Sequence, residues 1–288
     1  MAKKRIAIVT PTRDGLVDMN YTNSVFHTQK ILGKDYDVEL SLLSGVSDIV
    51  GGRNKIFNKW YYDTDVEYLL WVDSDISYSP LDLKKMLEFD VDVIGGNYPK
   101  KKIDVRTLLQ TASLMQNLTG EVDAQSCLEA SFEYVVGGQT NIIQGGDLDG
   151  LSTCEMLGMG MMLMKREGAD KLISWCDKNM TKKSWPWNGK MIEGYGVFDS
   201  SVNSDGHNLA EDFAFCSRLK EAGIKLYFHP RMKIRHSGYM AFDGDFQQVV
   251  DLAMLAYENG QEMPGTNYKK RSIEDVEEEK THEPKFED

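Results

Sequence analysis

The first hundred residues alternate between short apolar runs and stretches in which apolar residues recur at helical spacing. Four apolar runs, typical of buried strands, occur at residues 5–9, 38–43, 68–72 and 91–95. Stretches with helical spacing lie between them, at residues 22–32, 53–62 and from Ser79-Pro80 onward, where proline suits the first helical turn. This β-α-β-α-β-α-β order predicts an α/β fold with a Rossmann-like, mostly parallel central sheet flanked by helices.

The rest of the chain has a less regular pattern. Residues 104–150 show no clear period, and we expect strands and loops that lie over the working edge of the sheet. Segment 184–208 is rich in glycine, serine and asparagine, which favours a mobile loop that carries aromatic residues. The remaining elements are expected as helices at 167–176, 211–222 and 246–258, and as short strands at 225–228 and 233–235.

These elements predict one domain over residues 1–265. Its first half, with the regular β-α-β pattern, covers residues 1–103, and a smaller, less regular region covers 104–265. Residues 266–288 form an acidic segment with few apolar groups, for which we expect disorder.

Composition narrows the class of protein. The chain has 288 residues, 41% hydrophobic and 27% charged, as in ordinary globular domains. Its four cysteines are far apart and are expected to be reduced core residues of a cytoplasmic protein, in the host cytoplasm if the source is viral. No window approaches the roughly 20 apolar residues of a membrane span, so no stable membrane insertion is expected.

The net charge of −12 is unevenly distributed. Residues 271–288 carry eight acidic and three basic side chains, a net charge of −5, which leaves −7 for the rest. An acidic body argues against broad nonspecific binding to nucleic acid. It leaves room for a local basic rim, and Lys100, Lys101, Lys102 and Arg106 are candidates for one, together with Lys182 and Lys183.

Two carboxylates follow the third apolar run directly, in Asp73-Ser74-Asp75. The sequence contains Asp-x-Asp six times, but only this pair closes a strong apolar run. Ligands of open α/β sheets bind beyond the carboxyl ends of the strands, where this pair is expected. Two neighbouring carboxylates are costly to bury unless a cation joins them. The pair therefore predicts a divalent metal held for a phosphate-bearing ligand.

Four further motifs occur in a fixed order around this pair. They are Pro11-Thr12-Arg13 after the first strand, Gly158-Met159-Gly160 in an apolar segment, Glu211-Asp212 at a helix start, and His236. In this order and spacing the motifs resemble those of the GT-A fold glycosyltransferases, the nucleotide-sugar-dependent enzymes with a DxD metal motif. The resemblance is to family 2-like members, among which enzymes of the bacteriophage type have this compact form, and it covers roughly residues 3 to 240.

The resemblance implies a role for each motif. Asp75 would bind Mn²⁺ or Mg²⁺, with His236 and Asp73 as further metal ligands. The donor nucleotide, with a UDP-sugar favoured, would contact Pro11, Thr12, Arg13, Arg53, Asn54, Asp73 and Ser74. The donor sugar and the acceptor would lie near Gly158, Met159, Gly160, Trp185 and Trp187. Asp212 and Glu211 would be catalytic, and the activity implied is hexosyl or pentosyl transfer. Residues 1–103 would then be the nucleotide-binding half of the domain, and residues 104–265 its acceptor and catalytic half.

Elementary chemistry agrees with these roles. A nucleoside diphosphate leaves readily only when its charge is neutralised, which a divalent cation does. Hard cations prefer carboxylate oxygens, and Mn²⁺ tolerates one imidazole. A carboxylate within hydrogen-bond reach activates an acceptor hydroxyl, and the position of Asp212 early in a helix is expected to favour its ionised form.

Each motif also has a purely structural interpretation. Glu211 and Asp212 suit any helix N-terminus, and a lone histidine such as His236 is most often partly buried without binding a ligand. The methionine-rich stretch 156–164 and the two tryptophans suit a core, and Lys100–Lys102 suits a solvated surface.

Two other functions remain open from the sequence. A haloacid-dehalogenase-type phosphotransferase would use Asp73 as its nucleophile, although there the motif ends the first strand and here it follows the third. A non-catalytic module that binds nucleotide sugars or glycans is the other. The acceptor is open as well: some bacteriophage enzymes of this appearance glycosylate hydroxymethylated DNA bases, so modified DNA is one candidate, with Trp185 or Trp187 supporting a displaced base.

Overall fold

The computed structural model describes residues 3–238 and, further on, residues 255, 256, 258 and 259. The chain divides into one compact unit, Met1–Gly238, and a second unit, Tyr239–Asp288. The sheet and the candidate site belong to the first unit. The domain boundary expected at residue 265 and the acidic segment 266–288 lie outside the described residues, as does most of the helix expected at 246–258.

The helices are α1 (Met19–Leu32), α2 (Ile49–Asp63), α3 (Pro80–Glu88), α4 (Val105–Thr119), α5 (Ala124–Ala130), α6 (Arg166–Asn179) and α7 (Glu211–Glu221). The strands are β1 (Lys4–Pro11), β2 (Tyr36–Leu43), β3 (Tyr68–Val72), β4 (Ile76–Ser77), β5 (Val93–Gly95), β6 (Pro99–Ile103), β7 (Phe132–Tyr134), β8 (Val136–Gly137), β9 (Asn141–Ile142), β10 (Ser152–Cys154), β11 (Met156–Leu157), β12 (Met161–Lys165), β13 (Lys183–Trp187), β14 (Lys190–Gly194), β15 (Ser201–Val202), β16 (Asn208–Leu209), β17 (Leu226–Phe228) and β18 (Arg235–His236).

Within the described residues, eight strands form one sheet in the order β2-β1-β3-β12-β5-β17-β10-β9. Strand β1 pairs in parallel with β2 and β3, and β17 pairs in parallel with β5. Strands β12 and β10 run against the others, and β12 is inserted between β3 and β5. The α/β class with a mostly parallel central sheet is therefore confirmed.

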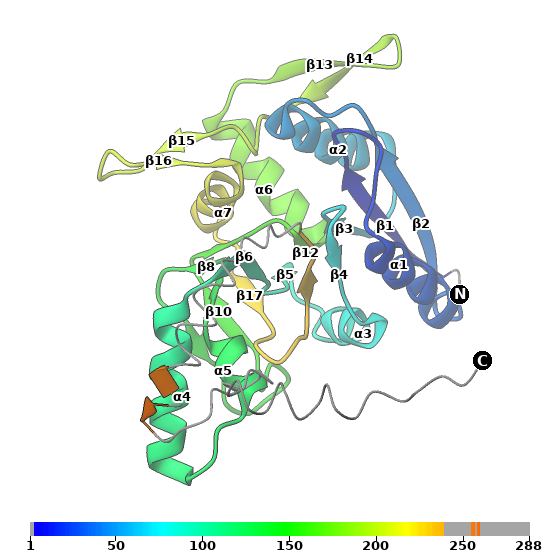
Figure 1. Cartoon of the computed structure of the whole chain (residues 1–288). Coiled ribbons are helices and arrows are strands. Elements are labelled where there is room, and N and C mark those ends of the chain that lie inside the picture. Colours follow the sequence, from blue (N-terminus) through cyan, green and yellow to red (C-terminus); the bar gives the residue numbers. More distant parts are fainter. Residues whose placement is uncertain (1–2, 239–254, 257, 260–288) are drawn as a thin grey trace, which may run out of the picture. The chain divides into compact units, whose positions relative to one another are not determined.

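Helices cover both faces of this sheet (Figure 1). Alternate residues of β1 enter different cores: Ile6 and Ile8 pack with α1 and α3, whereas Ala7 and Val9 pack with α2, α6 and α7. A strand that is buried on both faces reads as a continuous apolar run, which is why the sequence located β1 and β3 well.

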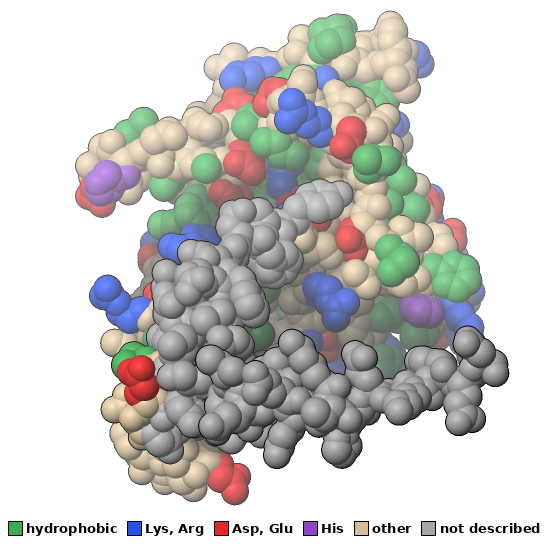
Figure 2. Space-filling view, in the orientation of Figure 1, with side chains coloured by type: hydrophobic (Ala, Val, Ile, Leu, Met, Phe, Trp, Pro, Cys, Tyr) green, Lys and Arg blue, Asp and Glu red, His purple; other side chains and the backbone are tan. Residues whose placement is uncertain are grey.

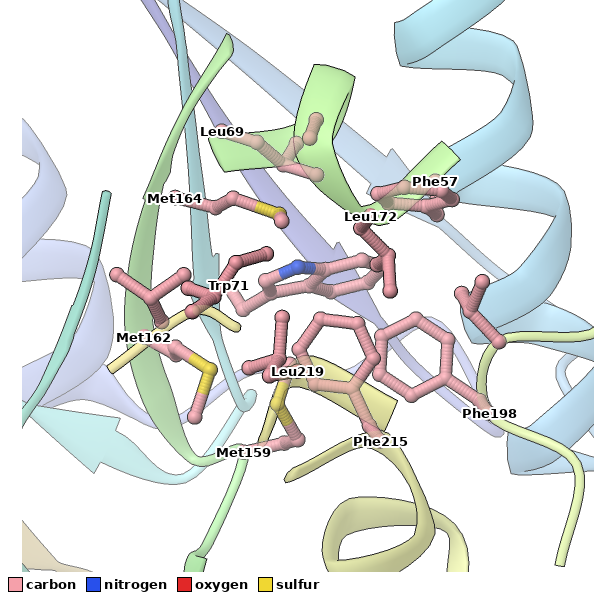
Figure 3. Close-up of a cluster of buried hydrophobic side chains, with 14 of the residues drawn as sticks. Phe57, Leu69, Trp71, Met159, Met162, Met164, Leu172, Phe198, Phe215 and Leu219 are labelled. Atoms are coloured by element: carbon pink, nitrogen blue, oxygen red, sulfur yellow. The ribbon is translucent and has the colours of Figure 1, made fainter. Parts of the chain in front are cut away.

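Trp71 of β3 lies at the centre of the second of these cores (Figure 3). Its ring meets the edge of Phe198 at 5.4 Å between centroids, and Phe198 stacks on Phe215 of α7 at 4.4 Å. These three aromatic side chains join β3, the segment before Asp199 and α7, so the core fixes the elements that carry the Asp-x-Asp pair and Glu211-Asp212.

Segment 104–150 differs from the expectation of strands and loops, because its first part forms α4 and α5. Asp104 caps α4 by accepting from the backbone N–H groups of Arg106 and Thr107, and Gly120 ends it in the left-handed conformation. Leu109 and Leu118 remain 65% and 74% exposed, so the apolar stripe of α4 is not a core stripe. Segment 184–208 also differs, since it forms the hairpins β13–β14 and β15–β16 instead of an irregular loop.

Candidate functional site

Asp73 follows the buried strand β3 and is held from two directions. Its backbone N–H donates to the carbonyl of Gly160 at 2.9 Å. Its carboxylate accepts from one guanidinium nitrogen of Arg53, at 3.0 and 3.3 Å to its two oxygens. The Arg53 side chain is only 5% exposed, so this ion pair lies at the inner wall of the site.

Arg53 also connects the Asp-x-Asp pair to the Glu-Asp motif. Its Nε lies 4.0 Å from Oε1 of Glu211, the first residue of α7. Among the described residues, Nε and the second terminal nitrogen of Arg53 have no hydrogen-bond partner. Unpaired buried donors are rare in native proteins, and both of these nitrogens are shielded from the surface.

The carboxylate of Asp75 does not share the Arg53 contact of Asp73. Two basic side chains approach one of its oxygens instead. Oδ2 lies 2.5 Å from Nζ of Lys101 and 3.5 Å from Nε2 of His236. His236 comes to this place because β18 pairs antiparallel with β4, with His236 opposite Ile76. The other ring nitrogen, Nδ1, lies 2.8 Å from the carbonyl oxygen of Pro99, which orients the imidazole.

The two carboxylates have opposite pKa shifts. Burial raises the pKa of Asp73, although the Arg53 charge opposes it, and the nearby charges of Asp75 and Glu211 raise it further. Burial acts in the same direction on Asp75, but hydrogen bonds from His236 and Lys101 outweigh it and lower its pKa to about 2. The surroundings of Asp75 therefore favour its charged form, which is the form that binds a cation.

Asp212 differs from the expectation for a residue early in a helix. Burial and the neighbouring charge of Glu211 raise its pKa, and they outweigh the hydrogen bond from the Phe213 backbone N–H that favours the ionised form. The helix start was expected to favour the ionised form of Asp212, and burial and the Glu211 charge act against that effect on its pKa. A raised pKa makes Asp212 a stronger base for a hydroxyl proton.

The segment Gly158-Met159-Gly160 is buried beneath Asp73. A Cβ on Gly158 would lie 2.3 Å from the Tyr98 hydroxyl, and one on Gly160 would lie 2.5 Å from the Tyr98 ring. The Gly160 N–H donates to that hydroxyl at 3.0 Å, and Met159 is a core residue. Gly160 positions Asp73 through its carbonyl, and all three residues of the segment are buried, so none of them forms an exposed turn.

The other residues assigned to the donor nucleotide are divided between the surface and the interior. Pro11 and Thr12 are buried at the end of β1, where the Thr12 N–H donates to the Leu43 carbonyl, whereas Arg13 is exposed. Ser74 is half-buried and its carbonyl accepts from the Asp18 N–H.

Asn54 is fully buried on α2 and faces away from the surface. Its amide accepts from the Phe198 N–H at 2.9 Å and donates to Asp199 at 2.8 Å. Asn54 therefore uses both atoms of its side-chain amide to hold the segment before β15 in place.

Trp185 and Trp187 lie on β13, apart from the carboxylates. They line a cavity of about 290 Å³ together with Gly51, Gly52 and Lys55 of α2. The Lys59 ammonium lies 5.8 Å from the Trp187 ring centroid. The structure thus places the two tryptophans in a second hollow, whose lining includes neither Asp75 nor Asp212.

The basic residues considered for a nucleic-acid rim do not share one face. Successive residues of a strand point to opposite sides, and on β6 Lys100 and Lys102 pair with Glu133 while Lys101 pairs with Asp75. Arg106 is exposed at the start of α4. On the face in Figure 2, the basic side chains of the described residues lie among acidic and apolar ones.

The residues around Asp75 fit a metal only in part. No cluster of three His, Cys, Asp or Glu side chains suited to hold a metal occurs among the described residues. Asp75 and His236 still supply one carboxylate and one oriented imidazole on the same side. Mg²⁺ and Mn²⁺ sites in phosphate-binding proteins commonly use one or two protein carboxylates and complete the shell with phosphate oxygens and water. The donor set fits such a shared site.

The sequence did not predict two contacts of the site. One is the hydrogen bond from the Gly160 N–H to the Tyr98 hydroxyl, and the other is the ion pair between Lys101 and Asp75. Tyr98 and Lys101 closely follow β5, which runs in the same direction as β3. Residues that follow parallel strands meet at one edge of the sheet, and this was the signal available for finding them.

Comparisons with known proteins gave matches among solved structures alone. No protein-family model matches the chain, and no curated protein matches its sequence. The structure is similar to A197 from STIV, with 16% identity, a TM-score of 0.44, and coverage of 82% of this chain and 86% of that chain. It is also similar to a mutant of a Drosophila β1,4-galactosyltransferase 7 in complex with manganese, UDP-Gal and xylobiose, with 11% identity, a TM-score of 0.38, and coverage of 99% and 82%.

A third similar structure is the inositol-1-phosphate CTP transferase from T. maritima, with 10% identity, a TM-score of 0.39, and coverage of 91% of this chain and 99% of that chain. At these identities and scores the likeness assigns no activity to this chain. Among the described residues, no helix is both long and apolar enough to cross a bilayer.

Proposed function

We propose that this chain is a metal-dependent glycosyltransferase that moves a sugar from a nucleoside-diphosphate donor, with a UDP-sugar favoured, to an acceptor hydroxyl. One observation carries the proposal: Asp75 and His236, far apart in the sequence, meet at 3.5 Å beyond the end of a buried strand, beside the Asp73–Arg53–Glu211 chain of charges. In this arrangement Asp75 and His236 would hold a cation, Arg53 supplies a positive charge behind them, and Asp212 follows Glu211 at the start of α7.

Asp75 and His236 would hold Mn²⁺ or Mg²⁺, with Asp73 kept beside them by Arg53. When bound, the cation neutralises the diphosphate that leaves with the nucleotide. Arg53 would place a fixed positive charge behind the anionic donor substrate. Pro11, Thr12 and Arg13 lie at the end of β1, at the same edge of the sheet, and would border the nucleotide.

Asp212 would act as the general base. The acceptor O–H proton passes to its carboxylate, the acceptor oxygen bonds to the anomeric carbon, and the bond from that carbon to the phosphate oxygen breaks. The raised pKa of Asp212 suits this proton transfer, because a stronger base draws the proton more completely as the new bond forms.

Transfer or donor hydrolysis measured with a panel of nucleotide sugars, with Mn²⁺ and with chelator, tests the proposal. We expect turnover that requires the metal and is lost in Asp75→Ala. Full activity in chelator, or unchanged activity in Asp75→Ala, would overturn it. Binding of a nucleotide sugar without turnover on any acceptor would favour the non-catalytic module.

The acceptor proposed from the sequence is a hydroxymethylated base of DNA. In its support, Arg106, Lys182 and Lys183 lie exposed on the surface, although Lys183 also pairs with Asp199. Binding to modified duplex that weakens with salt and is reduced by charge reversal at Lys182 and Arg106 would support this acceptor. Absence of binding at low salt would remove it.

A further inference from the structure

Lys101 has a place in the site that differs from that of the lysines beside it. Lys100 and Lys102 point to the other side of β6 and pair with Glu133. Lys101 reaches across to Asp75, and its ammonium lies 2.5 Å from the same oxygen that His236 approaches to 3.5 Å.

The path of this side chain depends on a residue without a Cβ. A Cβ on Gly238, two residues after His236, would lie 2.6 Å from Cδ of Lys101. The turn after β18 therefore leaves room for the lysine stem to lie across it and to bring the ammonium to the carboxylate.

We propose that Lys101 is an exchangeable internal cation: it occupies the place on Asp75 that a divalent metal takes, and it moves to the donor diphosphate when the metal binds. The second half of this proposal rests on the proposed function, because it needs a diphosphate at the site.

Charge and mobility support the exchange. A metal bound to Oδ2 of Asp75 and an ammonium at hydrogen-bond distance from the same oxygen would repel each other at close range. Lys101 is 41% exposed on a flexible four-carbon stem, so it is free to move away. Arg53, which is 5% exposed and holds Asp73, has no such freedom.

The displaced ammonium has a suitable partner when the donor is present. A diphosphate held by a metal on Asp75 would lie beside Lys101, and a lysine ammonium is a common phosphate-binding group. The exchange therefore makes two predictions of opposite sign. Removal of the Lys101 charge should strengthen binding of the metal alone and weaken binding of a nucleoside diphosphate to the metal-loaded protein.

The test uses the full chain with Lys101→Met, which keeps the length of the side chain without its charge. Binding of Mn²⁺ alone, followed by the electron paramagnetic resonance signal of free Mn²⁺, should become about tenfold tighter. Binding of UDP at saturating Mn²⁺, followed by calorimetry, should become about tenfold weaker. Lys100→Met, which removes the neighbouring ammonium that pairs with Glu133, should change each value less than about twofold.

Each remaining outcome overturns the proposal. Mn²⁺ binding in Lys101→Met that is equal to or weaker than in the wild type, with an unchanged thermal midpoint, shows that Lys101 does not compete with the metal. Tighter Mn²⁺ binding with unchanged UDP binding overturns the exchange. Failure of the proposed function is distinguishable, because it appears as an absence of sugar transfer and leaves the Mn²⁺ measurement intact.

Discussion

The two carboxylates of Asp73-Ser74-Asp75 are one residue apart and lie in contrasting surroundings. On the inner side, Asp73 is fixed by a buried arginine, by the Gly160 carbonyl and by the core behind it. On the outer side, Asp75 meets Lys101 and His236, which are 41% and 19% exposed. The difference indicates a division of work: one carboxylate holds the frame of the site, and the other is available to a ligand.

The largest expected effect is a loss of stability when the core behind Asp73 loses one of its aromatic side chains. Phe198→Ala should lower the free energy of unfolding by about 3–5 kcal/mol, because it empties the space between Trp71 and Phe215. Urea denaturation measures the change. Phe26→Ala, at a 62% exposed position, is the control and should change stability by less than about 0.5 kcal/mol. A loss below about 1 kcal/mol at Phe198 would show that the inner side does not depend on this packing.

The next effect separates the two carboxylates directly. Asp75→Asn should weaken Mn²⁺ binding about 100-fold, or about 2.7 kcal/mol, because it removes the charge that faces the cation. Asp73→Asn should weaken it less than about threefold, since Arg53 already occupies that carboxylate. Equal losses in the two variants, measured by titration with Mn²⁺, would remove the distinction between inner and outer sides.

A smaller effect tests how closely the inner side is packed. Gly160→Ala should cost about 1–3 kcal/mol of stability, because the new Cβ would meet the Tyr98 ring at 2.5 Å. At Gly137 the Cβ would meet Met156 at an ordinary 3.4 Å. Gly137→Ala is therefore the matched control, with a cost below about 1 kcal/mol in the same denaturation experiment. Similar costs at both positions would contradict close packing under Asp73.

The smallest effect is that Asp73 and Asp75 change the stability of the protein in opposite directions as the pH falls. The pKa of Asp75 falls from the ordinary 3.8 to about 2 on folding, so its contribution to stability is present above pH 3.8 and is lost as the pH falls toward 2. The pKa of Asp73 is raised, so the cost of its charge at neutral pH is relieved as the pH falls through the folded-state pKa.

Denaturation midpoints measured between pH 5 and pH 2.5, in the metal-free protein, test these opposite signs. Asp75→Asn should flatten the acid loss of stability, and Asp73→Asn should steepen it. Carboxyl carbon resonances in NMR should titrate above 3.8 for Asp73 and near 2 for Asp75. Titration in the reverse order would contradict the surroundings described for the two groups.

The sequence predicted the elements that are buried on both faces. The run Tyr68–Val72 was expected with the bounds that β3 has, because every residue in it is buried. The direction of β12 was not predictable, since an apolar run carries no information on whether it pairs in parallel or antiparallel. Helix α4 was missed although Asp104 and Gly120 mark its ends, because its leucines are largely exposed and the surrounding pattern is irregular.

The same limits apply to the candidate site. The sequence pointed to Asp75, Glu211 and His236, and the structure brings them to one edge of the sheet. The inward position of Asn54 and the reach of Lys101 depend on side-chain direction and strand register, which spacing alone does not give. The roles assigned to these residues stay predictions for the experiments above.

The two-residue pairing of β18 with β4 has a consequence for the order in which the site is completed on the ribosome. Lys101 leaves the ribosome 26 residues after Asp75. His236 leaves it about 160 residues after Asp75, which is a delay of about 8–30 s at ordinary rates of translation. Strand β12, which joins β3 to β5 in the sheet, is made before His236 as well, so the sheet beside Asp75 can form before the imidazole is added. The histidine side of Asp75 is therefore the last part of the site to be synthesised.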